Sequence, residues 1–236
     1  MKLSKYSNQK KTPPISGGIL NENSFITSST NRPSADIFNI LRTKVLAEMR
    51  VNDWNVLAIT SPRADAGKTF IAANLAISIS QEENHSALLA DFDFRHPSLQ
   101  KYFGITSKKG LSDYFYDDLP LSELLFRPDI ESLVVLPAGR PIRKSSELFS
   151  SSKMGHLVSD LKNKYPDRII LIDLPPLLGI SDAMTFLPKT DACLLVVAEA
   201  ETEVADLKQS MQLIDEKKFL GSVFNKSTEA SASLYY

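Results

Sequence analysis

The fold of this chain can be inferred from the stretch Val56-Leu-Ala-Ile-Thr-Ser-Pro-Arg-Ala-Asp-Ala-Gly-Lys-Thr-Phe70. Its first five residues form a short apolar run that predicts a buried strand. From Lys68 to Ser80 apolar residues recur at helical spacing, which predicts a helix. A buried strand that leads through a short loop into a helix is the unit from which parallel sheets are assembled.

The same alternation continues on both sides of this stretch. Helices are expected from a cap at Ser34 and around 147–164 and 203–217. The first helix is expected to bury Ile37, Ile40, Leu41, Val45 and Leu46. Further buried strands are expected at Ala87–Asp91, Leu133–Leu136, Ile169–Asp173, Cys193–Ala198 and Gly221–Phe224. Apolar strands between helices predict an α/β fold with a mostly parallel sheet, flanked by helices on both faces.

The length and composition of the chain limit the number and kind of domains that it can form. Its 236 residues, 43% hydrophobic and 23% charged, suit one compact domain at 34–226, a basic arm at 1–33 and a tail at 227–236. The net charge of −1 gives no reason to expect nucleic acid as a partner. The longest apolar run, Ala192–Ala198, is far shorter than the roughly 20 residues that span a bilayer. The single cysteine, Cys193, excludes an internal disulfide and fits the reducing cytoplasm.

Two interpretations stay open for the arm, which carries five basic residues against one acidic residue. Attraction to an anionic membrane surface would amount to about 4 kcal/mol, which assists membrane association without securing it. Alternatively, the arm is a solvated leader that has no partner.

The loop after the first strand carries residues suited to phosphate. Open parallel sheets bind ligands beyond the carboxyl ends of their strands, where this loop begins. Gly67 allows the backbone to approach a phosphate, and Lys68 supplies a cation for the β- and γ-oxygens of a nucleotide. Thr69 offers a hydroxyl to Mg²⁺ at a helix N-terminus, where backbone amides favour anions.

Acidic residues stand at the ends of two further strands. Asp91, Asp93 and Arg95 alternate after the second apolar run, so two carboxylates and a guanidinium are expected to converge there. Asp173 ends the fourth run at a matching tip. Three carboxylates at adjacent strand ends repel one another unless a cation lies among them, and a Mg²⁺–nucleotide complex is the economical explanation.

Together these segments resemble the cytoplasmic tyrosine autokinases of bacterial capsule and exopolysaccharide systems, the BY-kinases. That family belongs to the deviant P-loop NTPase class, with the cell-division and plasmid-partition ATPases, and the likeness covers most of residues 34–226. Gly67-Lys-Thr69 is similar to the end of the family's Walker A motif. Leu88–Arg95 is similar to its A′ motif, Ile169–Pro176 to its Walker B motif, and Gly221–Lys226 to its closing strand.

The resemblance implies a role for each motif residue. The implied catalytic residues are Lys68, Asp91, Asp93 and Asp173. Asp91 would mainly orient the hydroxyl of an incoming tyrosine, because phosphoryl transfer needs positioning more than early deprotonation. The implied Mg²⁺ residues, acting directly or through water, are Thr69, Asp93 and Asp173. The implied ATP-binding residues are Ala64, Asp65, Ala66, Gly67, Lys68, Thr69, Phe70 and Asn225. By analogy Asn225 would touch the adenine base.

The chain ends in Tyr235 and Tyr236, which the resemblance implies are phosphoacceptors. The 11 residues from Lys226 to Tyr236 extend to about 36 Å, enough to reach the site of a neighbouring molecule. Tyrosines at a chain end also occur where sequence drifts freely, and that interpretation stays open.

Two loop residues depart from the common pattern. Pro62 stands where a common P-loop has its first glycine and removes an amide donor. Asp65 stands where many relatives have another glycine and brings a carboxylate near the phosphates. A like charge at 4 Å opposes binding by about 1 to 4 kcal/mol, so weak ATP binding is expected. Arg63 stands where the partition ATPases carry an extra basic residue, and it either offsets this charge or points to solvent.

The first helix resembles a family interface motif through which kinase domains form rings. The aligned residues are Asp36, Asn39 and Arg42, with a shorter acid and without the first arginine. Self-association through this helix and packing on the domain's own core both stay open.

The leading expectation is an ATP- and Mg²⁺-dependent protein-tyrosine autokinase that regulates polymerisation or export of a capsule or exopolysaccharide. It would be a cytoplasmic homo-oligomer, held at the inner face of the plasma membrane by a separate membrane adaptor of the polysaccharide chain-length type. One alternative is a catalytically weak nucleotide-binding regulatory subunit of the same system. Another is a positioning ATPase of the partition type, although the sequence lacks the membrane-binding tail or basic surface that such proteins generally need.

Overall fold

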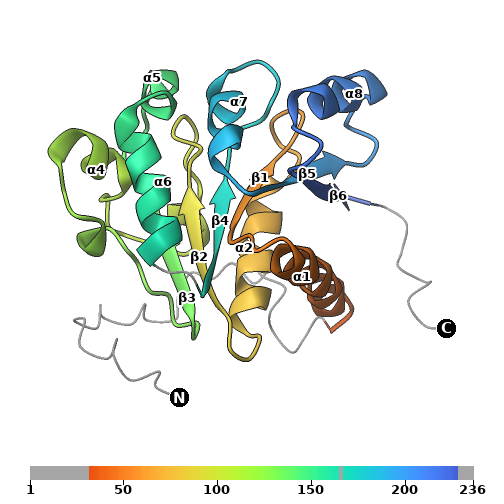
Figure 1. Cartoon of the computed structure of the whole chain (residues 1–236), viewed down its shortest axis with the longest axis horizontal. Coiled ribbons are helices and arrows are strands. Elements are labelled where there is room, and N and C mark those ends of the chain that lie inside the picture. The colour runs from red at the N-terminus through yellow and green to blue at the C-terminus, as the bar shows by residue number, and fades with distance from the viewer. Residues whose placement is uncertain (1–31, 165–166, 228–236) are drawn as a thin grey trace.

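The computed structural model describes residues 32–164 and 167–227. Six parallel strands form one sheet in the order β3-β2-β4-β1-β5-β6 (Figure 1). The strands are β1 (Val56–Thr60), β2 (Ser86–Asp91), β3 (Leu133–Leu136), β4 (Arg168–Asp173), β5 (Ala192–Ala198) and β6 (Phe219–Asn225). The expected α/β fold is confirmed. Nearly all of the expected arm and tail, including Tyr235 and Tyr236, lies outside the described residues.

Helices cover both faces of the sheet (Figure 1). One core layer holds α1 (Arg32–Val51), α2 (Lys68–Ser80) and α3 (Leu99–Tyr102). The other holds α4 (Leu111–Asp117), α5 (Ser145–Phe149), α6 (Ser152–Lys164), α7 (Asp182–Phe186) and α8 (Val204–Leu213), with the short 3-10 turns η1 (Leu121–Glu123) and η2 (Leu187–Lys189). Strand β1 shows the division, because Leu57 and Ile59 face the first layer whereas Val56 and Ala58 face the second.

The buried stripe of the first helix agrees only in part with the expected one, since Val45 is buried and Leu41 and Leu46 pack against the core. The helix begins at Arg32, before the expected cap at Ser34. Its fully buried apolar residues are Phe38, Val45 and Met49. Ile37 and Ile40, expected in the core, are 45% and 44% exposed. The helix packs mainly against α2, so one narrow stripe is covered and the residues beside it stay in solvent.

Polar contacts also join α1 to α2 within the chain. Arg42 donates a hydrogen bond to the Ser78 carbonyl at 3.0 Å and pairs with the Glu82 carboxylate at 2.7 Å. The Asn39 side-chain oxygen accepts a hydrogen bond from the Ser78 hydroxyl at 3.1 Å. Two of the three residues aligned with the family interface motif therefore bind the domain's own core.

The helix expected around 147–164 is divided into α5 and α6. The Ser151 hydroxyl accepts a hydrogen bond from the Met154 amide at 3.2 Å, as an N-cap does, so a new helix begins at Ser152. The helix expected at 203–217 is α8, which ends at Leu213.

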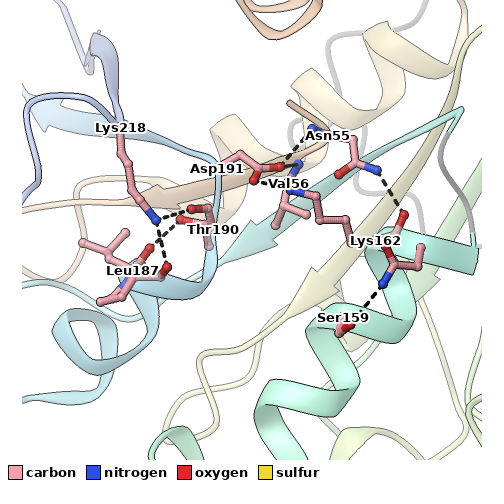
Figure 2. Close-up of polar contacts among 10 residues, drawn as sticks. Asn55, Val56, Ser159, Lys162, Leu187, Thr190, Asp191 and Lys218 are labelled. Carbon is pink, nitrogen blue, oxygen red and sulfur yellow. Dashed lines mark hydrogen bonds and ion pairs between the residues drawn. The ribbon is translucent and has the colours of Figure 1, made fainter. Parts of the chain in front are cut away.

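Asp191 joins three elements at the amino edge of the sheet (Figure 2). Its Oδ2 accepts hydrogen bonds from the Asn55 and Val56 amides, each at 3.1 Å, where β1 begins. Its Oδ1 accepts one from Nζ of Lys162 on α6 at 2.5 Å. Nearby, Lys218 donates to the Thr190 carbonyl at 2.6 Å. This carboxylate therefore fixes how β1 enters the sheet beside β5.

Replacing Asp191 by alanine is expected to lower the free energy of unfolding by about 2 to 3 kcal/mol, because two backbone amides and an ammonium group lose their acceptor. Lys162→Ala removes a partner that is 41% exposed, so a loss below about 1 kcal/mol is expected. Urea unfolding of both variants measures the difference. Equal losses would mean that the carboxylate acts mainly through the lysine.

Candidate functional site

The candidate site lies where three central strands end. The β2–β4 ladder pairs Asp91 with Asp173, and the β1–β4 ladder pairs Ile59 with Asp173. Sheet register alone therefore brings two of the predicted carboxylates together beside the start of the loop after β1. β2 and β3 lie to one side of the β4–β1 pair, and β5 and β6 lie to the other. Ligands of open α/β sheets bind at such a switch point.

The segment after β4 holds the start of the P-loop. The Thr60 hydroxyl donates to the Pro175 carbonyl at 2.8 Å. The amides of Leu177 and Leu178 donate to the carbonyls of Ser61 and Pro62 at 2.9 and 3.1 Å. The loop is thus connected to the Asp-x-Pro-Pro segment by three hydrogen bonds.

Asn225 holds the other end of the loop. Its side-chain amide, at the carboxyl end of β6, donates to the Ala66 carbonyl at 2.9 Å. Gly67 has a φ of 87°, and a Cβ there would lie 2.1 Å from Nδ2 of Asn225. Glycine is therefore required by both conformation and space. The expected contact of Asn225 with a base stays a prediction, and its described contact is with the loop backbone.

Thr69 and Asp173 are in direct contact. The Thr69 hydroxyl donates to Oδ2 of Asp173 at 2.5 Å, and the Ser98 hydroxyl lies 3.1 Å from Oγ1 of Thr69. Lys68 and Asp173 are both buried. Oδ1 of Asp173 is buried and has no hydrogen-bond partner among the described residues. A buried acceptor of this kind is a ready ligand for a cation.

Asp91 has a structural task that the sequence did not reveal. It is fully buried, and its oxygens accept hydrogen bonds from three backbone amides, those of Asp93, Ser98 and Leu99, at 2.9 to 3.1 Å. The carboxylate therefore shapes the turn that leads into α3. The available signal was Ser98 directly before the apolar Leu99, the pattern of a helix N-cap.

The expected convergence of Arg95 with Asp91 and Asp93 is wrong. β2 ends at Asp91, so the alternation of a strand does not continue beyond it. Oδ1 of Asp93 accepts a hydrogen bond from the His96 amide at 3.1 Å. Arg95 pairs at 3.1 Å with buried Asp182, at the start of α7, which also accepts a hydrogen bond from the hydroxyl of Ser145.

The Arg63 side chain is 68% exposed, in line with the expectation that it points to solvent. Neither expectation included its partner, because the guanidinium forms a two-point ion pair with Asp206 in the first turn of α8. An offset of the Asp65 charge by Arg63 stays a prediction. Asp65 is exposed and has a φ of 61°, in the left-handed region. No sequence pattern pointed to Asp206, since an acid in the first turn of a helix is common.

The remaining loop residues differ in exposure. Ala64 is exposed, whereas Ala66 is buried. The Phe70 ring packs edge to face on Phe38 of α1, with ring centroids 5.9 Å apart. The Phe70 side chain therefore belongs to the contact between α1 and α2. Its contribution to a phosphate site is its backbone, in the first turn of α2.

Burial governs the protonation of the paired carboxyls. Burial, together with the Asp173 charge, raises the pKa of Asp91 to about 8. Burial also raises the pKa of Asp173 to about 7, against the opposing influence of Lys68 and Thr69. Burial raises the pKa of Asp93 too, although its bond to the His96 amide opposes this. The site therefore favours a bound cation over three free charges.

Asp91, Asp93 and Asp173 lie close enough for their charges to interact, and the expectation that they surround one ion with Lys68 stays a prediction. Within residues 32–164 and 167–227, no three His, Cys, Asp or Glu side chains lie together so as to hold a metal by themselves. Asp91 and Asp93 face backbone amides instead. Asp173, with its unpartnered Oδ1, and the Thr69 hydroxyl still fit Mg²⁺, whose other ligands in such sites are water and phosphate oxygens.

Several bacterial proteins have sequences similar to this chain. CapB of Staphylococcus aureus is 29% identical over 201 residues, 84% of this chain and 87% of its own length. Tyrosine-protein kinase CpsD of Streptococcus agalactiae is 26% identical over 205 residues, 86% of each chain. The chain spans 24% of the length of tyrosine-protein kinase ptk of Acinetobacter johnsonii, to which it is 27% identical. No family model matches the chain.

Solved structures repeat the likeness. The chimerical protein CapA2B2 superposes with a TM-score of 0.75 at 28% identity, over 91% of this chain and 94% of its own. The kinase domain of Escherichia coli tyrosine kinase ETK gives a TM-score of 0.74 at 25% identity, over 83% and 78%. The septum site-determining protein MinD of Pyrococcus horikoshii, solved with Mg-ADP, shares the fold with a TM-score of 0.61 at 24% identity, over 75% and 72%.

Every helix in the described ranges is too short or too polar to cross a bilayer.

The paired carboxyls predict how stability varies with pH. In the folded state Asp91 and Asp173 have pKa values of about 8 and 7, against about 3.9 when unfolded. The folded state then holds more protons than the unfolded state between these values, so stability is expected to fall as the pH rises from about 5 to about 8. Thermal melting without Mg²⁺ or nucleotide measures the trend.

Asp173→Asn serves as the control, because it removes one of the two charges. Its melting temperature is expected to fall less steeply over the same pH range. A slope as steep as that of the wild type would contradict the assignment of the trend to this pair.

Proposed function

Because this chain belongs to the family of bacterial tyrosine kinases, we propose that it transfers the γ-phosphoryl group of ATP to tyrosine hydroxyls. The observation that carries the proposal is the contact of Thr69 with Asp173 beside buried Lys68. That contact joins the residues that follow the P-loop to the end of the Walker B strand. The likeness to CpsD and to the ETK kinase domain supports the same activity.

The chain's own residues would divide the work of transfer. Lys68 and the amides at the start of α2 would bind the phosphates. Thr69 and Asp173 would hold Mg²⁺, with Asp93 supporting them through water. Bound Mg²⁺ neutralises the charge that develops on the phosphate oxygens.

Asp91 would keep an incoming tyrosine hydroxyl in line with the γ-phosphorus. The phenolic oxygen would form the new bond to phosphorus as the bond between phosphorus and the leaving oxygen of ADP breaks, and the proton of the hydroxyl would pass to the Asp91 carboxylate, its candidate base. The three amides bonded to Asp91 fix its carboxylate, and this rigidity suits an orienting role.

The substrate and setting are part of the proposal. The phosphoacceptors would be Tyr235 and Tyr236 of a neighbouring copy. The autokinase would regulate polymerisation or export of a capsule or exopolysaccharide from the cytoplasmic face of the membrane. A separate membrane adaptor would recruit it, and the structure of the CapA2B2 chimera supports looking for such a partner.

A direct test mixes the purified chain with Mg²⁺ and ATP, with and without the cytoplasmic tail of its adaptor, and detects phosphotyrosine. Lys68→Ala and Asp173→Asn are each expected to lower the rate by at least about 100-fold, because each removes charge stabilisation of the transferred group. Asp160→Asn, on the surface of α6, is the matched control and should keep full activity. Tight binding of Mg-ATP without any phosphotyrosine would instead favour the catalytically weak regulatory subunit.

One observation favours the regulatory-subunit alternative. Asp65 in the P-loop is exposed, and its backbone lies in the left-handed region. Asp65→Gly is expected to tighten Mg-ATP binding about fivefold, because a carboxylate near the phosphates costs about 1 kcal/mol in water. It should also stabilise the fold, by about 1 kcal/mol, since glycine adopts this φ freely.

Asp53→Gly separates the two effects. Asp53 is also exposed and has a φ of 55°, but it lies before β1 at the opposite edge of the sheet. It should raise stability similarly and leave Mg-ATP affinity unchanged when both are measured by melting and calorimetry. Unchanged affinity in Asp65→Gly would mean that the Asp65 carboxylate does not oppose the phosphates.

A further inference from the structure

The P-loop of this chain is held in a shape that its own residues disfavour. Asp65 has a φ of 61°, which glycine adopts freely and other residues adopt at a cost. Pro62 removes a backbone donor. A strained backbone persists where surrounding contacts determine its conformation. The contacts around loop residues 61–67 are therefore part of how the site is built.

Those contacts are unevenly spread along the loop. The amides of Leu177 and Leu178 hold its first two carbonyls, and Asn225 holds the carbonyl of Ala66. Between these points, the side chain of Arg63 reaches α8. Its Nε and Nη2 both donate to the carboxylate of Asp206, the latter at 2.8 Å.

The two partners differ in exposure. The Arg63 side chain is 68% exposed, whereas that of Asp206 is 9% exposed. The hydrogen bond from Arg63 lowers the pKa of Asp206, so the carboxylate stays charged. A two-point pair fixes the orientation of the guanidinium as well as its distance. The nearly buried anion on α8 therefore fixes a loop residue two positions before Asp65.

We propose that Arg63 and Asp206 form a positioning pair that holds the P-loop in its phosphate-binding shape, and that Arg63 does not itself contact the nucleotide. The inference rests on the proposed nucleotide site. Asp206 engages Nε and Nη2 of Arg63 and thereby fixes the direction of its guanidinium, so we assign its contribution to the shape of the loop, and the variants below distinguish this from a phosphate contact through Nη1. The pair also makes α8 part of the support of the nucleotide site.

A double-mutant cycle tests the pair against direct phosphate contact. Arg63→Ala, Asp206→Ala and the double variant are compared with the wild type for Mg-ADP affinity by calorimetry. Each single variant is expected to weaken binding about fivefold to tenfold, and the double variant no more than either single one. Arg63→Lys, which keeps the charge without the two-point geometry, should fall between.

Kinetics provide a second measurement. The KM for ATP in phosphotyrosine formation should rise with the dissociation constant, while kcat stays within about twofold, because the pair supports binding and not the transfer step. Arg140→Ala is the matched control. Arg140 is 57% exposed and pairs with Asp117 on α4 at 2.5 Å, away from the loop, so its loss should leave Mg-ADP affinity unchanged.

The other outcomes overturn the inference. If Arg63→Ala weakens binding while Asp206→Ala does not, Arg63 contacts the phosphates directly. If neither changes affinity, or if the losses add in the double variant, the two residues do not act as a pair. A wild type that does not bind Mg-ADP refutes the proposed function as well. Melting checks the fold of each variant, and Asp206→Asn replaces Asp206→Ala if that chain does not fold.

Discussion

The carboxyl edge of this sheet is organised around one buried carboxylate, that of Asp173. A buried carboxylate needs partners, and this one has Thr69 on one oxygen and none among the described residues on the other. Asp91 lies opposite it in register, so each charge makes the other less favourable. Without a cation the site is electrostatically incomplete. The P-loop, α3 and the Asp-x-Pro-Pro segment all surround this one group.

The rest of the site can be understood as support for that arrangement. Backbone amides fix Asp91, and the segment after β4 is bonded to the P-loop. Support also comes from elements distant in sequence, α8 through Asp206 and β6 through Asn225. A loop that keeps Gly67 but has Pro62 and Asp65 in place of two usual glycines is thus supported by contacts from other elements, where a more typical loop relies on the freedom of its own backbone.

The strands could be predicted from the sequence, because continuous apolar runs follow directly from residue order. The family resemblance implied that Thr69 and Asp173 serve one ion, and the structure adds their direct contact. The buried stripe of α1 could not be predicted in full. Ile37 and Ile40 fit an apolar helical face as well as the buried Phe38 does, and only the position of α2 decides which face is covered. The partners of Arg95 and Arg63 were missed for a related reason. Those partners, Asp182 and Asp206, follow 87 and 143 residues later, and no local pattern connects them.

The position of Asn225 late in the sequence affects when the loop can be completed during synthesis. The glycine-lysine-threonine segment is made early, yet the side chain that closes over Gly67 belongs to the last strand of the sheet. During translation the chain emerges with β1 and α2 long before β6 exists. A nascent polypeptide therefore cannot complete the contacts around Gly67 until nearly all of the domain has left the ribosome.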